Sequence, residues 1–208
     1  MQNLLSSLEP RDTKTELVHV VVDTTRGSRN KLKYDAALDC FKPSRILPVG
    51  HVLPYDFGSV PGTRAADGDA LDVLVLIDDP TFPGCVVTVR LIGVLAARQT
   101  QDEHTLPNDR LIGAPETPAN GSSFHHLEEL GDACLDEIEH FFVAYNQAQG
   151  RTFEPTKNTG NSLDFGSSVE FPARIRRRFR PLTRGFPADC NTEFFEAEQG
   201  INFSQNRE

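Results

Sequence analysis

The sequence predicts an α+β fold, in which several short strands form a small barrel or a curled sheet and one late helix packs against it. Two observations predict this fold. Short apolar runs rich in valine recur through the first half of the chain, and one later stretch repeats its apolar residues at helical spacing. At 208 residues, with 38% hydrophobic and 25% charged residues, the chain is typical of one soluble globular domain.

The predicted strands follow one another along the first hundred residues. LVHVVVD at 17–23 is almost continuously apolar, as a buried strand would be. KLKYDA at 31–36 alternates, which indicates a second strand. The run 71–77 is a third, and CVVTVRLIGVLAARQ at 85–99 is a further strand or a bent pair, with FPG as the turn before it. The Pro- and Gly-punctuated stretch 51–69 is too irregular for long elements.

The only helix that we predict with a clear pattern covers residues 132–150, DACLDEIEHFFVAYNQAQG. Its apolar stripe consists of Leu135, Ile138, Phe142 and Tyr145. Gly150 is placed to end the helix, because glycine readily adopts the left-handed conformation found after helix ends. The helix is therefore expected to bury one face against the strands.

Composition divides the chain into three parts. Residues 1–14 form a loose leader, and residues 15–150 contain the predicted strands and the helix. Residues 151–208 are polar and rich in Gly, Asn, Arg and Pro, so we expect an irregular C-terminal extension. Within it, RIRRRFRPLTR at 174–184 favours a solvated tail or a partner surface, with contact to RNA or another anionic partner as the alternative.

Net charge and the lack of targeting signals narrow the class of protein. A net charge of −9 argues against a general nucleic-acid binder, whose affinity depends on neutralising phosphates. No apolar run approaches the ~20 residues of a membrane-spanning helix. The N-terminus also lacks the basic and apolar regions of a signal peptide. The four cysteines are widely spaced, which favours reduced thiols and a cytoplasmic protein, although an even count leaves disulfides open.

The most unusual stretch is DGDALDVLVLIDD at 67–79, where Asp67, Asp69 and Asp72 open a buried strand. Aspartate is depleted in strands, and close carboxylates repel one another unless something neutralises them. An Asp-Gly turn would explain Asp67 and Asp69 without any ligand. Alternatively, carboxylates that converge at a bend can hold a hard divalent cation. A calcium-binding EF-hand is excluded, because its sixth position needs Gly and its twelfth needs Glu. A turn and a metal site both stay open at this point.

Other charged residues near the predicted strands favour a phosphate ligand together with a metal. Lys33 and Asp35 occupy alternate positions of one strand, so they share a face. Asp23 ends the first strand, and Arg45 follows the second. Arginine binds phosphate oxygens with its planar fork, and lysine acts as a compact charge. Each residue alone could be an ordinary surface charge, but together they predict a phosphate-plus-metal site.

In the order of its motifs, the chain resembles the soluble (family I) inorganic pyrophosphatases. DGDALDVLVL is similar to the signature of that family, in which Asp-x-Asp-Pro-x-Asp precedes an apolar strand. Four further segments come in the family's order: KYD, VLPYDFGSVPGT, PGCVVTVRLIGVL and IEHFFVAYN. The resemblance covers about residues 15–150, which it makes a pyrophosphatase-like catalytic domain.

The resemblance implies a five-stranded, OB-like β-barrel with flanking α-helices, a homo-oligomer, and hydrolysis of pyrophosphate to two phosphates. The implied cofactor is Mg²⁺, with Mn²⁺ or another divalent cation as alternatives. Asp69 would deprotonate the water that bridges two metals. The implied metal ligands are Asp23, Asp67, Asp72, Asp102 and Asn108. The implied substrate contacts are Lys33, Asp35, Arg45, Phe57, Arg110 and Tyr145, although Tyr145 also fits a purely core role on its apolar stripe.

Some positions depart from the family pattern. Ala70 replaces the signature's Pro, which affects conformation only. Phe57 and Leu53 stand where hydroxyl-bearing tyrosines are expected, and Asn146 replaces a lysine. The pocket therefore loses two hydroxyls and becomes more apolar than the family norm.

The loop before LIGAP differs most from the family pattern. Counting back from LIGAP puts Arg110 at the family's lysine and Asn108 at its second metal-binding Asp, while the first is Asp102 or Glu103. Asparagine keeps an oxygen donor but loses the charge, and Asp109 could take its place if the loop shifts by one residue. One metal site is therefore in question.

Three functional hypotheses follow from these residues. The first is a divergent, Mg²⁺-dependent pyrophosphatase, which the retained base and phosphate-binding cations favour. The second is a hydrolase of a different small phosphate ester, which the more apolar pocket would suit. The third is a non-catalytic phosphate-binding or interaction protein, suggested by the lost carboxylate and the arginine-rich tail.

Overall fold

A computed structural model describes residues 8–12, 14–15, 17–65, 68–116, 124–156 and, for the backbone only, 159–160. One helix, α2, and one 3₁₀-helix, η1, lie among strands β1 to β11 in this part of the chain. The elements in chain order are β1 (Val18–Thr24), β2 (Asn30–Asp35), β3 (Cys40–Ile46), β4 (Asp56–Val60), β5 (Leu71–Val75), β6 (Val86–Leu95), β7 (Ala97–Gln101), β8 (His104–Pro107), β9 (Arg110–Pro115), η1 (Leu127–Leu130), α2 (Asp132–Gln147), β10 (Thr152–Pro155) and β11 (Thr159–Gly160).

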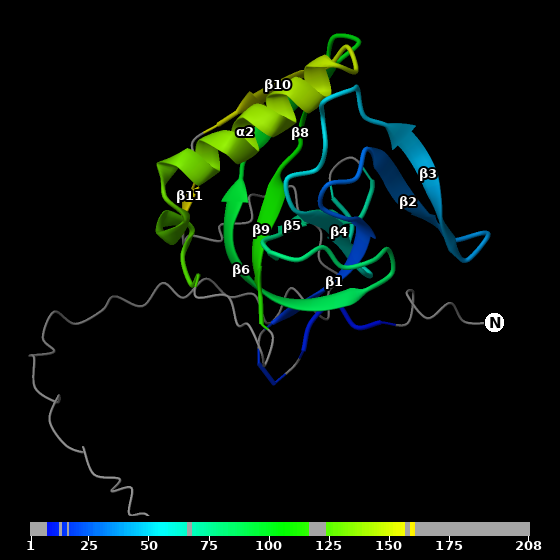
Figure 1. Ribbon diagram of the computed structural model, residues 1–208, viewed down its shortest axis with the longest axis vertical. Helices are drawn as coiled ribbons and strands as arrows, with labels where there is room; N and C mark the ends of the chain where they lie inside the picture. Colours follow the sequence, from blue (N-terminus) through cyan, green and yellow to red (C-terminus); the bar gives the residue numbers. More distant parts are fainter. Residues whose placement is uncertain are drawn as a thin grey trace, which may run out of the picture.

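Five of the strands form a closed barrel (Figure 1). Their hydrogen-bonding order is β1-β4-β5-β9-β6, and β6 pairs back with β1 to close the sheet. Neighbouring strands run antiparallel except β5 and β9, which are parallel. Closure removes the unpaired edges that an open sheet would expose. The predicted α+β class and the five-stranded barrel are confirmed.

The local patterns located some strands and missed others. The runs 17–23, 31–36 and 71–77 correspond to β1, β2 and β5, and 85–99 is the bent pair, β6 and β7. The patterns did not predict β3, β4, β8 and β9. These strands contain Gly or Pro, or carry few β-branched residues, so their sequences alone look like loops. Pairing with barrel neighbours or within a hairpin decides that they are extended.

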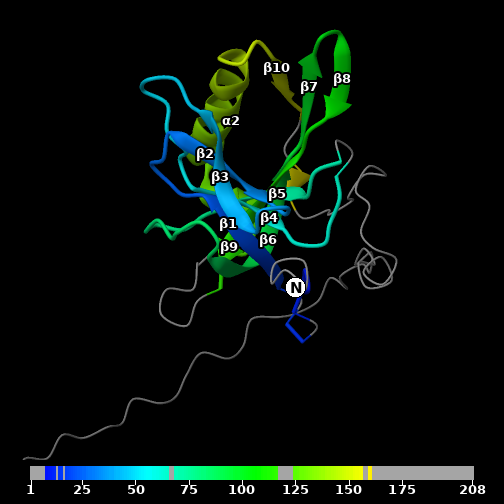
Figure 2. The same ribbon diagram turned by 90° about the vertical axis from the view of Figure 1, so that its right-hand side faces the viewer.

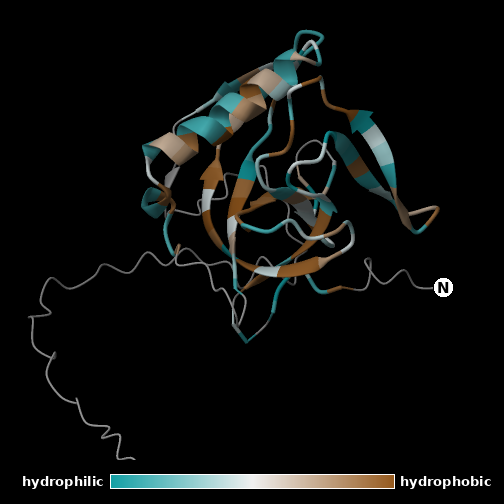
Figure 3. Cartoon of the chain, viewed as in Figure 1, coloured by the Kyte–Doolittle hydropathy of each residue, from teal (hydrophilic) through white to brown (hydrophobic). Residues whose placement is uncertain are grey.

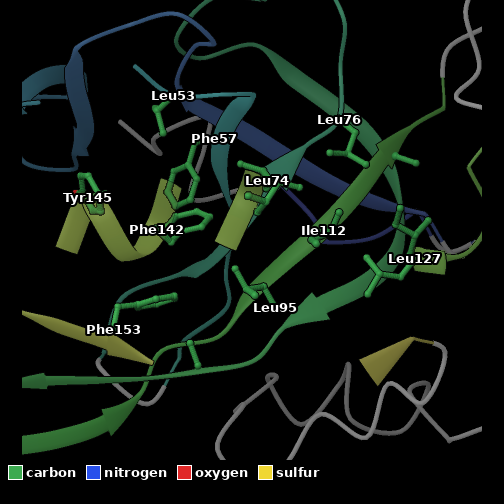
Figure 4. Packing of buried hydrophobic residues seen from close by; sticks show 14 of the residues in the cluster. Leu53, Phe57, Leu74, Leu76, Leu95, Ile112, Leu127, Phe142, Tyr145 and Phe153 are labelled. Atoms are coloured by element: carbon green, nitrogen blue, oxygen red, sulfur yellow. The ribbon is translucent and has the colours of Figure 1, made fainter. Parts of the chain in front are cut away.

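Two clusters of buried hydrophobic side chains hold the fold together. One draws on all five barrel strands and fills the barrel: Val18, Val20, Val22, Val60, Leu71, Val73, Val75, Val87, Val89 and Leu111. Alternate residues such as Leu74 and Ile112 point to the other face and join Phe142 of α2 and Phe153 of β10 in a second cluster (Figure 4). The barrel is therefore apolar on the inside and also under the helix.

The helix α2 lies across the outer face of the barrel, as Figure 1 shows. Hydrophobic and hydrophilic residues alternate along it, whereas β6 and β9 beneath are largely hydrophobic (Figure 3). The predicted apolar stripe is confirmed by the buried side chains of Ile138, Phe142 and Tyr145. After the last helical residue the chain turns through Gly150, whose φ of 70° lies in the left-handed region.

Two hairpins extend the barrel, β2 with β3 and β7 with β8 (Figure 2).

The strand β10 pairs with β7, and its Phe153 is buried in the second cluster. Folded structure thus continues beyond the expected domain end at residue 150. At the other boundary, the Pro10 carbonyl accepts a hydrogen bond from His19, and Arg11 forms a bridge with Val18. Residues assigned to the leader and the extension therefore contact the barrel.

The described cysteines Cys40, Cys85 and Cys134 are free thiols. Cys190 and the arginine-rich stretch 174–184 lie outside the described residues. In the part of the chain that the structure describes, no helix combines the length and the apolarity needed to cross a membrane.

Gly58 lies where β4 passes close to β1. A Cβ at this position would overlap the carbonyl oxygen of Val21 and would lie 2.9 Å from Cγ1 of Val20. Because the first of these neighbours is backbone, it cannot move aside as a flexible side chain could. We expect Gly58→Ala to lower the free energy of unfolding by about 1–3 kcal/mol, as overpacked cores do. Urea unfolding followed by circular dichroism measures the change, and an unchanged midpoint would contradict a tight crossing of the two strands.

Candidate active site

A cavity of about 470 Å³ opens where the β2–β3 hairpin, the rim of the barrel and α2 meet. Most of the predicted site residues line it: Asp23, Lys33, Arg45, Phe57, Asp69, Asp72, Asn108, Arg110 and Tyr145. Asp35 and Asp102 are not among the lining residues, and Asp67 lies outside the described residues. Residues far apart in the sequence are brought together because the barrel places the ends of its strands side by side.

Asp23 and Asp72 come from neighbouring parts of the barrel wall. Asp23 lies at a bulge near the end of β1, and Asp72 of β5 pairs with Ser59 of β4. Asp23 is buried, and its burial, followed by the negative charge of Asp72, raises the pKa of Asp23 to about 7. A hydrogen bond from Ser59 and the charge of Lys31 act in the opposite direction. Asp23 therefore carries less than a full negative charge at neutral pH.

Arg110 begins β9, the parallel neighbour of β5, so it meets Asp72 across the sheet. Its Nη1 lies 2.8 Å from Oδ2 of Asp72. The guanidinium carbon lies 5.9 Å from the ring centre of Phe57 and 5.8 Å from that of Phe142. Arg110 is only 9% exposed, and its Nε has no hydrogen-bond partner among the described residues. A buried guanidinium with an unused donor is well suited to an anionic oxygen.

Asp69 lies on the open rim of the cavity. Both of its carboxylate oxygens contact Nζ of Lys33, at 2.9 and 2.8 Å. The two side chains are about equally exposed, 61% for Lys33 and 60% for Asp69. Exposed ion pairs of this kind contribute little to stability and rearrange easily. Asp69 therefore remains accessible to water and to a ligand in the cavity.

Lys31 is a cavity residue that the sequence analysis missed. Its Nζ lies 4.6 Å from the ring centre of Phe57 and 5.3 Å from that of Tyr145. Burial raises the pKa of Tyr145, but the positive charges of Lys31 and Arg45 and a hydrogen bond from Gln149 outweigh burial and lower it. Tyr145 thus belongs both to the core and to the cavity wall. Lys31 stands two residues before Lys33, and this same-face spacing could have revealed it.

The expected metal ligand Asp102 does not reach the cavity. Asp102 and Glu103 form the two-residue turn between β7 and β8, with φ of 49° and 64°. Left-handed values at both central positions are what a type I′ hairpin turn requires. Both side chains are exposed at the tip of the hairpin. Asp102, which the resemblance implied as a metal ligand, therefore lies at the tip of the β7–β8 hairpin and not on the cavity wall.

Gln99 of β7 lines the cavity in place of a carboxylate. Asn108 donates a hydrogen bond from Nδ2 to Oε1 of Gln99 at 2.7 Å. Asp109, which could have replaced Asn108 after a shift of one residue, instead accepts a hydrogen bond from the backbone N–H of Ala97. The register therefore does not shift, and this wall of the cavity consists of two neutral amides.

Asp35 has a structural role in the β2–β3 turn. Its carboxylate contacts Nζ of Lys42 at 2.8 Å and accepts hydrogen bonds from the backbone of Ala37 and Leu38. The hydrogen bond from Lys42 is the main cause that lowers the pKa of Asp35. The structure thus gives no support to Asp35 as a substrate contact. Leu53 likewise lies in the hydrophobic core and does not line the cavity.

Residues 20–164 match the family model for inorganic pyrophosphatase. The chain belongs to the inorganic pyrophosphatase family. This pyrophosphatase is 36% identical to the inorganic pyrophosphatase of Thermus thermophilus over 159 residues, which make up 75% of this chain and 87% of the relative. It is 34% identical to the inorganic pyrophosphatase of Synechocystis over 145 residues, 70% of this chain and 83% of the relative.

Solved structures agree with this assignment. The crystal structure of the inorganic pyrophosphatase from Thermus thermophilus is similar with a TM-score of 0.67 and 33% identity, covering 75% of this chain and 89% of that one. The inorganic pyrophosphatase from Neisseria gonorrhoeae gives a TM-score of 0.66 at 27% identity, with the same coverage. The resemblance drawn from the motifs is confirmed for this pyrophosphatase.

Proposed function

We propose that this pyrophosphatase hydrolyses inorganic pyrophosphate to two phosphates with the help of a divalent cation, of which Mg²⁺ is the first choice. The observation that carries the proposal is that Asp69 and Asp72 share one cavity with Lys33 and Arg110. Carboxylate oxygens suit Mg²⁺, and Lys and Arg suit phosphate oxygens. Relatives named inorganic pyrophosphatase support the same reaction.

The described residues fit a cation that is shared with the substrate. Asp69 and Asp72 offer carboxylates on the cavity wall, and Asp67 precedes them in the same motif. Among the described residues, which leave out Asp67, no three His, Cys, Asp or Glu side chains are grouped to hold a metal. Mg²⁺ is commonly bound by one or two carboxylates together with substrate phosphates. Asp69 and Asp72, with Asp67, would hold one such cation.

Each step of the reaction has a residue in the cavity to support it. When bound, the divalent cation supplies Lewis acidity that acidifies water and neutralises charge on the pyrophosphate. Asp69 accepts a proton from the water whose oxygen attacks one phosphorus. The bond from that phosphorus to the bridging oxygen breaks, and the second phosphate leaves with the electron pair. Lys33, Arg45 and Arg110 bind phosphate oxygens and stabilise the charge that develops during this step.

Phosphate release from pyrophosphate tests the proposed function. We expect the folded, full-length protein to turn over in Mg²⁺ and to lose turnover in EDTA, because water is a poor nucleophile at neutral pH without a Lewis acid. Colorimetric phosphate detection at several Mg²⁺ concentrations measures this. No release above background at any of them would contradict the proposal.

Hydrolysis of a small organic phosphate ester is a second candidate, favoured by one observation. Phe57 presents an apolar ring to the cavity, where the resemblance predicts a tyrosine. Leu53 no longer supports this candidate, since it lies in the core. A panel of phosphate compounds compared by kcat/KM distinguishes the two substrates. Pyrophosphate binding without any turnover would instead favour a non-catalytic role.

We propose that this pyrophosphatase is a homo-oligomer, as the resemblance implies, and that it is cytoplasmic, as the widely spaced cysteines favour. Ile46 at the end of β3 and Val49 just after it are 65% and 85% exposed. These two side chains offer apolar surface for a contact between copies of the chain.

A further inference from the structure

Thr24 is the last residue of β1 and is fully buried, next to Asp23 but not on the cavity wall. Its hydroxyl group makes two hydrogen bonds to one residue of β2. It accepts a hydrogen bond from the backbone N–H of Leu32 at 2.9 Å and donates one to the carbonyl oxygen of Leu32 at 3.4 Å. The hydroxyl thus pairs with both backbone groups of Leu32, as a neighbouring strand in a ladder would.

The hydroxyl of Thr24 links the β2–β3 hairpin to the barrel, since β1 and β2 belong to different sheets. Within the hairpin, Leu32 is opposite Pro43 of β3, which has no N–H to donate. The pairing of β2 with β3 also shifts its register between Lys31 and Leu32. The middle of β2 therefore depends on Thr24 more than a regular strand would depend on one side chain.

The two residues that flank Leu32 are the cavity residues Lys31 and Lys33. Nζ of Lys31 lies 4.6 Å from the ring centre of Phe57, which Figure 4 labels. In the pairing of β1 with β4, Thr24 is opposite the same Phe57. Thr24 therefore holds the strand of the ring through its backbone pairing and the strand of the ammonium group through its hydroxyl.

We propose that Thr24 is a positioning residue, whose hydroxyl fixes the backbone between Lys31 and Lys33 and so keeps both ammonium groups in place on the cavity wall. This inference rests on the proposed function, since it takes these two cations to act in pyrophosphate hydrolysis. Preorganised charges stabilise a transition state only when they are well placed, and a displacement of about 1 Å can cost about a hundredfold in rate. Thr24 thus acts on the reaction without touching the substrate.

Thr24→Val removes the hydroxyl and keeps the size and the branching of the side chain. We expect kcat for pyrophosphate in Mg²⁺ to fall by about 10–100-fold, because Leu32 loses its anchor. Thr24→Ser keeps the hydroxyl, and its kcat should stay within about threefold of that of the unmodified protein. Colorimetric phosphate detection on the full-length protein measures these rates.

Thr81→Val is the matched control. Oγ1 of Thr81 donates a hydrogen bond to Oδ2 of the buried Asp56 at 2.6 Å, and Thr81 does not line the cavity. Because this hydroxyl stabilises the fold, urea unfolding of the control should show a lower midpoint, while kcat stays within about twofold of the unmodified value. If Thr24 only stabilised the fold, the two valine variants would behave alike.

Tyr145 reports the position of Lys31 without any turnover, since Nζ of Lys31 lies 5.3 Å from its ring centre. Burial raises the pKa of Tyr145, but the charge of Lys31 is the foremost of the causes that together lower it. The other two tyrosines, Tyr34 and Tyr55, have pKa values raised to about 12, mainly by burial, so Tyr145 titrates first. We expect Thr24→Val to raise the pKa of Tyr145, because a more distant ammonium group stabilises the phenolate less. The ultraviolet absorbance of tyrosinate, followed against pH, measures this change.

The outcomes separate this inference from the proposed function. If folded Thr24→Val, checked by circular dichroism, kept both the kcat and the pKa of Tyr145 of the unmodified protein, the inference would be overturned. A change in only one of these two readouts, when the unmodified protein is active, would also overturn it, and so would an equal loss of rate in Thr24→Ser. A pKa of Tyr145 that is raised in Thr24→Val and normal in Thr24→Ser would support the placement of Lys31. It would do so even if the unmodified protein released no phosphate in Mg²⁺, a result that contradicts the proposed function alone.

Discussion

Asp69→Asn is expected to lower kcat for pyrophosphate hydrolysis by about 10²–10⁴-fold, the usual contribution of a general base. Asparagine keeps the size of the side chain and an oxygen, but it cannot accept the proton that the attacking water must lose. Asp69 lies on the rim of the cavity, where its carboxylate contacts Nζ of Lys33, and an exposed ion pair of this kind contributes little to the stability of the fold. Binding of the substrate should therefore change far less than the rate.

Phosphate release at saturating Mg²⁺ measures the effect on kcat, and calorimetry with pyrophosphate checks that binding is retained. Asp79→Asn is the matched control, since Asp79 is exposed in the turn after β5 and does not line the cavity. Turnover of Asp69→Asn close to that of the control would show that another group removes the proton.

Phe142→Ala is expected to lower the free energy of unfolding by about 3–5 kcal/mol, as large truncations in packed cores do. Phe142 is 3% exposed and joins α2 to the barrel. Its ring centre lies 6.3 Å from that of Phe57 on β4 and 5.9 Å from that of Phe153 on β10. Removing the ring would leave a cavity between three elements that cannot all collapse into it.

Guanidinium unfolding monitored by circular dichroism measures this change. Phe82→Ala is the control, because Phe82 is 65% exposed and its truncation should fall within about 0.5 kcal/mol of the unmodified protein. A difference of less than about 1 kcal/mol between the two variants would contradict the central position of Phe142 in the core. Phe142 also packs against Arg110, so weaker pyrophosphate binding should accompany the loss of stability.

Local sequence was sufficient to predict an element where the hydrophobic pattern lay within a single strand or helix. The apolar runs of β1 and β5 and the stripe of α2 depend on spacing within a single element, and each is found in the structure. The same holds for Lys33, Asp69 and Arg110, whose positions followed from ordered motifs and which all line the cavity. The local patterns did not predict strands β4 and β9, because the residues of these strands become extended only through pairing with barrel neighbours.

The site differed from expectation where position depended on how a loop folds. Asp102 and Asn108 are close in sequence, but the β7–β8 hairpin places Asp102 at its tip and keeps Asn108 at its base. Strand pairing thereby brings Gln99 beside Asn108. No count of residues along the loop could show this, because the length of the hairpin, and not the spacing of the acids, sets which side chains reach the cavity.

By itself, the sequence determined the family, several of the barrel strands, the helix and most of the predicted residues that line the cavity, because these depend on residue types at short, ordered spacings. The tertiary structure alone decided which charges act together. It placed Arg110 on Asp72, Lys33 on Asp69 and Lys31 against two aromatic rings. Charges interact through distances in space, and barrel closure, which brings distant strands together, sets those distances.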